Sequence, residues 1–247
     1  MCDPVIAPPE WADRFHEELV YLPSVVAYNH PSDMPDVSSL PVTENDGVIT
    51  FGSFNQPKKL STKALTLWAR VLNAVPNSRL ILRHSGLEQT YAETRVRDHF
   101  EDAGIETGRV HIFGGSSHWD HVAAFTDLDI QLDPTPASGG MTTLEGLWMG
   151  VPTLTLYGDR AAGRISASIM TTLGMADWIA TDEDEYVRLA VEKAADTAAL
   201  AEVRAGLRDL LRESVICDVT QYVPAVEQAF RTLWHRWCER QRAEVAA

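Results

Sequence analysis

The feature that most constrains the fold is an alternation of short apolar runs and helix-like segments, which begins at Gly47. The apolar runs cover residues 48–51, 79–82, 110–113, 128–132, 153–156 and 178–179. The segments between them have helical spacing and cover residues 61–75, 87–103, 117–125, 142–149 and 163–173. Strands that alternate with helices predict an α/β fold with a doubly wound, Rossmann-like parallel sheet. Ligands of such sheets bind beyond the carboxyl ends of the strands, where the strand order reverses.

Two segments flank this pattern. Seven of the thirteen prolines precede Gly47, which predicts an irregular lead-in over residues 1–46, with one short helix near residues 11–20. From about residue 182 the chain is expected to be helical, so residues 47–247 are predicted to form one domain with a helical C-terminal extension. In that extension, core positions are expected for Phe230, Trp234 and Trp237. A solvated face is expected for Lys193, Arg204 and Arg208.

The charge and the cysteines restrict the partners and the environment. The formal net charge is −14, and so acidic a surface argues against nucleic acid and anionic membranes as partners. Cys2, Cys217 and Cys238 are far apart and odd in number, which favours reduced thiols over disulfides or a zinc site. No run of about 18 apolar residues and no signal-peptide pattern is found, so a cytoplasmic protein is expected.

The most informative segment for ligand binding covers residues 133–152, where a predicted strand ends and a helix begins. Gly139 and Gly140 allow the backbone to approach a ligand, and the helix start offers free N–H groups beside the hydroxyls of Thr142 and Thr143. This arrangement is typical of an anion site. The alternative is that Thr142 only caps the helix and Glu145 completes a capping box.

Two further loops follow predicted strands at the same edge. The first contains Gln56 and Lys59, and a lysine there can neutralise a diphosphate as it departs. The second contains Ser116, His118 and His121, with the two histidines on one helical face. Each has a plainer alternative: solvated lysines in the first loop, and surface or capping residues in the second.

A metal site is not expected. Asp127 and Asp129 could hold a divalent cation, but they straddle the start of a predicted buried strand, and Asp120 lies off the face of the two histidines. No P-loop, zinc spacing or serine–histidine–acid order is found either.

Taken together, these segments resemble the C-terminal catalytic lobe of protein O-GlcNAc transferases and SPINDLY-like proteins, glycosyltransferase family 41. The resemblance runs from about residue 17 to about residue 237. It rests on segments that occur in the family's order: residues 18–23, 54–59, 74–78, 139–152, 164–174 and 221–222. The family implies a two-lobed GT-B enzyme whose C-terminal lobe holds a UDP-sugar without a required metal or other cofactor.

The resemblance also implies roles for individual residues. Gln56 and Lys59 would contact the diphosphate, with Lys59 stabilising the leaving group. The backbone and hydroxyls of the helix start would cradle it, and this set comprises Gly140, Met141, Thr142 and Thr143. Glu145 would face the ribose. The uracil side would be formed by Ser116, His118 and His121.

The sequence departs from the family at several of these positions. Met141 replaces a hydroxyl residue, Glu145 an aspartate, His118 a lysine and Ala124 an arginine. The family's N-terminal lobe, with its acceptor contacts and general base, has no counterpart in this sequence. The expectation is therefore the UDP-sugar-binding half of a transferase that acts on a protein acceptor, working with a separate N-terminal lobe or helical-repeat chain. The alternative is a non-catalytic UDP-binding or interaction module.

Overall fold

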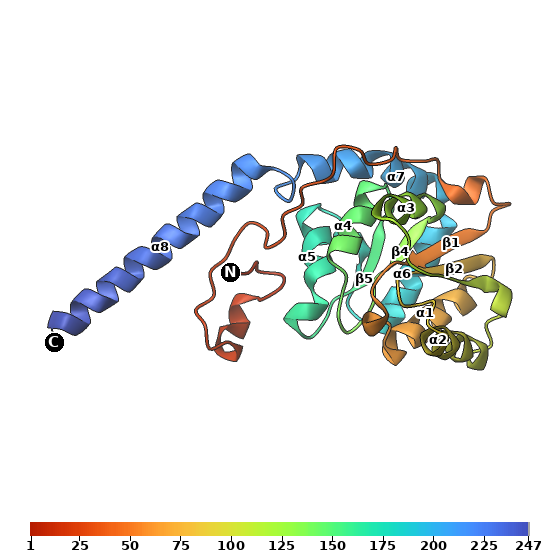
Figure 1. Cartoon of the computed structure of the whole chain (residues 1–247), viewed down its shortest axis with the longest axis horizontal. Coiled ribbons are helices and arrows are strands. Elements are labelled where there is room, and N and C mark those ends of the chain that lie inside the picture. The colour runs from red at the N-terminus through yellow and green to blue at the C-terminus, as the bar shows by residue number, and fades with distance from the viewer. Residues whose placement is uncertain (247) are drawn as a thin grey trace.

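The computed structural model describes residues 1–246 and contains one sheet of six parallel strands in the order β3-β2-β1-β4-β5-β6 (Figure 1). The strands are β1 (Ile49–Ser53), β2 (Ser78–Arg83), β3 (Val110–Phe113), β4 (Ile130–Leu132), β5 (Thr153–Leu156) and β6 (Ile179–Ala180). The strand order reverses between β1 and β4, which lie side by side. The predicted doubly wound parallel sheet is confirmed, and the reversal fixes where a ligand site is expected.

Helices cover both faces of this sheet. They are α1 (Thr62–Ala74), α2 (Thr90–Asp102), α3 (His118–Ala123), α4 (Met141–Trp148), α5 (Ile165–Thr172), α6 (Glu183–Ala195), α7 (Thr197–Glu213) and α8 (Val219–Ala246). Helix α1 packs against α2 and α6, whereas α4 packs against α7. Fully buried apolar side chains, among them Phe51, Trp68 and Leu80, fill the space between the layers.

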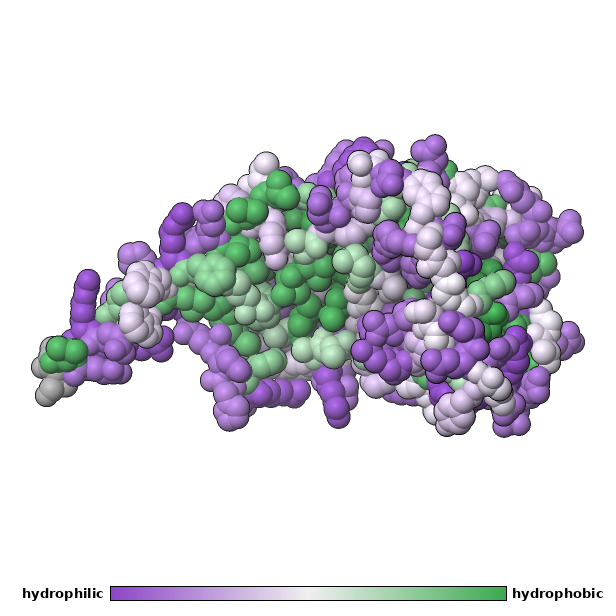
Figure 2. All heavy atoms as spheres, viewed as in Figure 1, coloured by the Kyte–Doolittle hydropathy of each residue, from purple (hydrophilic) through white to green (hydrophobic). Residues whose placement is uncertain are grey.

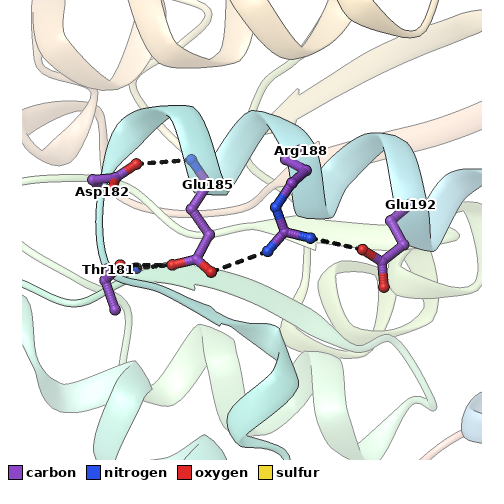
Figure 3. A network of polar contacts seen from close by, with 5 residues as sticks. All are labelled: Thr181, Asp182, Glu185, Arg188 and Glu192. Carbon is purple, nitrogen blue, oxygen red and sulfur yellow. Dashed lines mark hydrogen bonds and ion pairs between the residues drawn. The ribbon is translucent and has the colours of Figure 1, made fainter.

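Side-chain caps explain where several helices begin. Ser61 accepts a hydrogen bond from the backbone of Ala64 at the start of α1, as the sequence predicts. At α6, Asp182 accepts from the backbone N–H of Glu185, whose carboxylate in turn accepts from Thr181 (Figure 3). Arg188 extends this chain of contacts to Glu192. Because these groups are exposed, the network fixes the position of the helix start and adds little stability.

The lead-in, residues 1–46, lies along the domain mostly in extended form. The predicted helix near residues 11–20 is wrong, because only a 3₁₀ turn at Pro9–Arg14 forms. Cys2 and Tyr21 form an isolated β-bridge, in which Cys2 N–H donates to Val20 O at 2.9 Å. This pairing keeps the residues around Tyr21 extended. Farther along, Tyr28 N–H donates to Ile216 O at 2.8 Å. The lead-in is therefore held by backbone hydrogen bonds at several points.

The expectation of a solvated face for Arg204 and Arg208 is wrong. Arg204 is only 2% exposed and donates to the carbonyl oxygens of Ser38, Leu128 and Thr126. Arg208 donates to Trp148 O and Pro35 O. Arg204 therefore joins α7 to the lead-in and to the residues before β4, and the half-buried Arg208 joins α7 to the lead-in and to α4. Lys193 pairs with Asp177 and lies over the ring of Trp178.

The expected core packing of the last helix is also wrong. In α8, Phe230 is 62% exposed, Trp234 61% and Trp237 48%, and the helix projects away from the domain (Figure 1). The rings of Trp234 and Trp237 stack on each other with centroids 5.1 Å apart. Apolar side chains gather in the hollow between α8 and the rest of the molecule (Figure 2). The aromatic face of α8 therefore has little of this chain to pack against.

Candidate functional site

The carboxyl ends of β1 and β4 bring two of the predicted loops together. The loop after β1 carries Lys59, and the loop after β4 leads into the start of α4. Two hydrogen bonds join these loops: Lys59 Nζ donates to Ser138 O at 2.5 Å, and Ser61 Oγ donates to Thr135 O at 2.5 Å. The reversal of strand order thus places a lysine directly beside a helix start.

Asp133, the first residue after β4, organises the second loop. Its carboxylate is buried and accepts from Gly139 N–H at 2.6 Å and from Thr155 Oγ1 at 2.7 Å. Burial raises the pKa of Asp133 to about 6, against the lowering effects of these hydrogen bonds and of Lys59. Gly139 has to be glycine, because a Cβ there would lie 2.2 Å from Thr143 Oγ1 and 2.8 Å from Asp133 Oδ1. Asp133 therefore fixes the backbone that leads into α4.

Lys59 lies half-buried in the turn Pro57–Lys59. Burial lowers the pKa of its ammonium, and the nearby Asp133 carboxylate opposes that shift. Gln56 begins the same turn and is exposed, with its carbonyl accepting from Lys59 N–H at 2.8 Å. Lys58 is exposed as well. The turn thus presents one lysine toward the neighbouring loop and the other toward solvent.

The start of α4 is free of side-chain caps. Gly140 occupies the N-cap position without a side-chain hydrogen bond, so the alternative in which Thr142 caps the helix is wrong. Thr142 Oγ1 instead donates to Asn55 Oδ1 at 3.0 Å, and the hydroxyl of Thr143 lies 2.9 Å from that of Ser166. Met141 is 58% exposed. The first N–H groups of an α-helix lack partners within the helix and attract anions.

The loop after β3 reaches the same helix. His118 Nδ1 lies 3.9 Å from one carboxylate oxygen of Glu145, and His121 Nε2 lies 3.6 Å from the other. The Glu145 side chain is 7% exposed and that of His121 20%, whereas that of His118 is 63% exposed. Ser116 is exposed, and its hydroxyl donates to Ser117 O. The structure therefore brings both histidines and Glu145 together, which the sequence did not predict.

An aromatic wall supports His121. Its ring centroid lies 5.6 Å from that of Phe54 and 5.7 Å from that of Phe125, and these two phenylalanine rings are 4.5 Å apart. Phe54 and Phe125 are fully buried. The imidazole of His121 is therefore packed against two buried rings and is still 20% exposed, which leaves part of it available to a flat ligand.

Sequence reasoning missed three polar residues that hold this site: Asp133, Ser138 and Ser166. Ser138 Oγ accepts from Ile165 N–H at 3.0 Å and so ties the loop to α5. The sequence offered one signal, the position of Asp133 directly after an apolar strand. Its partners are Gly139 in the same loop and Thr155 in β5, and the sequence alone does not place them beside it.

Asp129 does not face Asp127 across a metal site. Its two carboxylate oxygens accept from the backbone N–H groups of Val42 at 2.9 Å and Thr50 at 2.7 Å. Within residues 1–246, no group of three or more His, Cys, Asp or Glu side chains has a geometry that could hold a metal ion. Over the same residues, no helix combines the length and the apolar character that crossing a membrane requires.

Comparison with known proteins agrees with this architecture. The family model of glycosyl transferase family 41 matches residues 31–226. A protein from Petunia hybrida described as a probable UDP-N-acetylglucosamine–peptide N-acetylglucosaminyltransferase SPINDLY is 37% identical over 239 residues. That match covers 96% of this chain and 26% of the petunia protein. The chain thus spans about a quarter of the length of such relatives.

Solved structures give the same result. A mutant O-GlcNAc transferase from Thermobaculum terrenum superposes with a TM-score of 0.88 at 31% identity, covering 97% of this chain and 45% of that one. S. aureus TarM, solved with UDP, shares the fold with a TM-score of 0.59 at 10% identity. The predicted fold, the C-terminal lobe of a GT-B enzyme, is confirmed. On its family match, its SPINDLY relatives and its structural likeness, the chain belongs to glycosyl transferase family 41.

Proposed function

We propose that this chain is the UDP-sugar-binding half of a transferase that moves a sugar, N-acetylglucosamine, to protein hydroxyls without a metal ion. The printed names of the SPINDLY relatives give this donor and a peptide acceptor. Because the chain spans only part of those proteins, the complete reaction needs residues from outside it.

The observation that carries the proposal is the meeting of Lys59 and the start of α4 at the reversal of strand order. A diphosphate bound there would receive the ammonium of Lys59, the free N–H groups of α4, including that of Thr143, and the hydroxyl of Thr142. The Thr143 hydroxyl is buried against Ser166 and would hold the helix start in place. Charge develops on the departing UDP during transfer, and fixed donors stabilise it without reorganisation. These groups would replace a metal ion as the leaving-group clamp. Gln56, exposed in the same turn, is placed to add a contact.

The nucleoside would lie toward the loop after β3. His121, backed by Phe54, would stack on the uracil, with Ser116 and His118 beside it. Glu145 would accept from the ribose hydroxyls, since its carboxylate is held by two long histidine contacts and retains accepting capacity. Met141 would contribute only its backbone N–H to the diphosphate.

The proposed partner is an N-terminal lobe, either alone or joined to a helical-repeat chain. The exposed aromatic face of α8 and the apolar hollow beside it are the surface on which we place that lobe (Figure 2). Large exposed apolar patches typically mark protein interaction sites. The acceptor contacts and the general base would come from the partner.

A transfer assay tests this function. The chain is mixed with the N-terminal lobe of a family 41 relative, UDP-N-acetylglucosamine and an acceptor peptide, and the glycosylated peptide is measured by mass spectrometry. We expect product only when both halves are present, and the same yield with EDTA. Lys58→Ala serves as the matched control for Lys59→Ala, which should abolish most of the product. UDP binding without transfer would instead support the alternative, a non-catalytic UDP-binding module.

A further inference from the structure

One face of the sheet is open beside β2 and β3. In the parallel register, Thr50 is paired with Arg79, Ile81 with His111, and Arg83 with Phe113. Side chains alternate along a strand, so Arg79, Ile81 and Arg83 point to the same face. Phe113, at the end of β3, is 46% exposed. This part of the sheet therefore lacks the helical cover that the rest of it has.

A basin of about 340 Å³ lies on this face. Its wall toward the centre of the sheet is formed by Phe54 and by the turn Ala124–Asp127. The basic side chains that line it are those of Arg79, Arg83 and His111. Pockets that bind small molecules typically have volumes of about 300–1,000 Å³, so the basin has room for a compact ligand.

The two arginines of the basin lack acidic partners. Within residues 1–246, no carboxylate oxygen lies within 4 Å of a guanidinium nitrogen of Arg79 or Arg83, whereas six of the seventeen arginines have such partners. Arg79 Nε donates to Thr50 Oγ1 at 2.9 Å, which orients its guanidinium. Arg83 Nε is buried without a hydrogen-bond partner, and its guanidinium lies 5.9 Å from the ring centroid of Phe113. In a chain with net charge −14, unpaired arginines in one basin need an explanation.

The acidic groups near the basin do not neutralise it. Asp127 lies on its wall, but makes no ion pair with either arginine. Asp129 is buried, its two oxygens accept from backbone N–H groups, and the charges of Arg204 and Arg79 lower its pKa, but it forms no ion pair with Arg79. The pKa of His111 is lowered by burial and by the charges of Arg79 and Arg97, which shows that excess positive charge surrounds the imidazole. The basin therefore has an excess of positive charge that a bound anion would neutralise.

We propose that this basin binds the phosphoryl group of a small phosphorylated compound, at a site separate from the donor edge. Arginine guanidinium groups match phosphate oxygens in a bidentate manner, and an aromatic floor from Phe54 and Phe113 suits a compact organic body. The basin and the donor edge share one wall, because Phe54 lines the basin and also contacts His121. The proposal stands on the geometry of the basin and is independent of the proposed transferase function.

Calorimetric titrations with inorganic phosphate, glucose 6-phosphate and glucose test this site. We expect the two phosphorylated probes to bind and glucose not to bind. Arg83→Gln should weaken phosphate binding about tenfold or more, the effect of losing one charged hydrogen-bonding group. Arg79→Gln is the second variant, and Arg188→Gln, an exposed arginine on α6, is the matched control with the same charge change. Thermal unfolding of each variant confirms that it is folded.

Phosphate could also occupy the proposed diphosphate site, so every titration is repeated in Lys59→Ala. Phosphate binding to the basin should be unchanged in Lys59→Ala and about tenfold or more weaker in Arg83→Gln. UDP binding should instead be weakened in Lys59→Ala and unchanged in Arg83→Gln. A bound phosphate should also raise the pKa of His111, measured by NMR titration of its ring protons.

Three results would overturn the proposal. The first is the absence of phosphate binding in Lys59→Ala. The second is phosphate binding that is equal in the wild type, Arg83→Gln and Arg79→Gln. The third is an acidic or phosphorylated peptide that binds to the basin while both small probes fail, because this would make the open face a protein-docking surface.

Discussion

The two ends of strand β4 carry buried aspartates with opposite uses. Asp129 precedes the strand and Asp133 follows it, and burial raises the pKa of both carboxyl groups. At the amino end, Asp129 accepts from two backbone N–H groups, of Val42 and Thr50, and lies near the buried Arg204. Every group in that cluster binds another part of the same chain. It fastens the lead-in and α7 to the sheet.

At the carboxyl end, the partners of Asp133 are buried as well, but the loop that Asp133 orders leads into a helix start without a side-chain cap. Asp133 orders Gly139, and the next residues open α4 with N–H groups that have no side-chain cap. Lys59, half-buried beside them, donates from its ammonium group to one carbonyl oxygen, that of Ser138. The comparison teaches that a buried charge alone does not indicate a site. What distinguishes the carboxyl end is a buried acid that orders the loop into an uncapped helix start, with the half-buried Lys59 bound to the carbonyl oxygen of Ser138 in that loop.

Removing the acid at the amino end should have the largest effect on stability. Asp129→Ala leaves the backbone N–H groups of Val42 and Thr50 without their acceptor and removes the negative charge near the buried Arg204. We expect the free energy of unfolding to fall by about 3–5 kcal/mol, measured by urea denaturation. Asp209→Ala, an exposed acid on α7, is the matched control and should change stability by less than about 0.5 kcal/mol. Comparable losses in the two variants would show that Asp129 is not a structural link.

The acid at the carboxyl end should make stability depend on pH. The pKa of Asp133 is raised from 3.8 to about 6 in the folded state, so the folded state holds this proton more tightly than the unfolded state does. Stability from this group is greatest below pH 4 and falls by about 3 kcal/mol as the pH rises through 6. The measurement is the difference in unfolding free energy between the wild type and Asp133→Asn at each pH. A difference that stays constant from pH 4 to pH 7 would contradict the assignment.

The backbone between Asp133 and α4 can be tested by adding one methyl group. Gly139→Ala places a Cβ against Thr143 Oγ1 and Asp133 Oδ1 and should cost about 1–3 kcal/mol of stability. It should also weaken UDP binding, because the start of α4 has to move. Gly206→Ala in α7 is the control, since its Cβ would meet nothing within 4 Å and should stabilise the helix by about 0.5–1 kcal/mol. Unchanged UDP affinity in Gly139→Ala would show that the loop before α4 does not take part in UDP binding.

The smallest effect on stability is expected in α8, where the aromatic side chains are exposed and no buried charge is involved. Replacing Trp234 and Trp237 by serine should change the free energy of unfolding by less than about 0.5 kcal/mol, because both rings are largely exposed. The same variant should lose its binding to a supplied N-terminal lobe, measured by analytical ultracentrifugation. A large loss of stability without a loss of association would instead place these rings in a core of this chain.

Much of the fold could be predicted from the sequence because its signals are local. Apolar runs such as residues 153–156 mark strands, and Ser61 marks the start of α1 through its own hydroxyl. The lead-in was harder, because residues 16–22 take their conformation from a bridge to Cys2 at the other end of the segment. Helix propensity is judged from neighbouring residues only, so it cannot reveal a pairing with Cys2, which lies many residues earlier in the chain.

Arg204 shows a signal that was present and misinterpreted. It lies on the buried stripe of α7 together with Leu200, Leu207 and Leu211, at helical spacing. The charge of Arg204 suggested an exposed side chain. Its position on the apolar stripe of α7 indicated a buried one, and it donates to carbonyl oxygens that include Ser38 O of the lead-in. The aromatic residues of α8 show the reverse case, because apolar character suggested a core that this chain does not supply. In the candidate site, the strand-end positions were predictable, whereas the contacts of Glu145 with His118 and His121 depend on two loops meeting.

The most direct test of the central claim, that the carboxyl edge of β1 and β4 binds a nucleotide diphosphate, is calorimetry of UDP binding. We predict that the wild type and Lys58→Ala bind UDP equally, with and without EDTA. Lys59→Ala should bind about ten to a hundred times more weakly, as expected for the loss of one charged contact to phosphate. Equal UDP affinity in Lys59→Ala and Lys58→Ala would contradict the account.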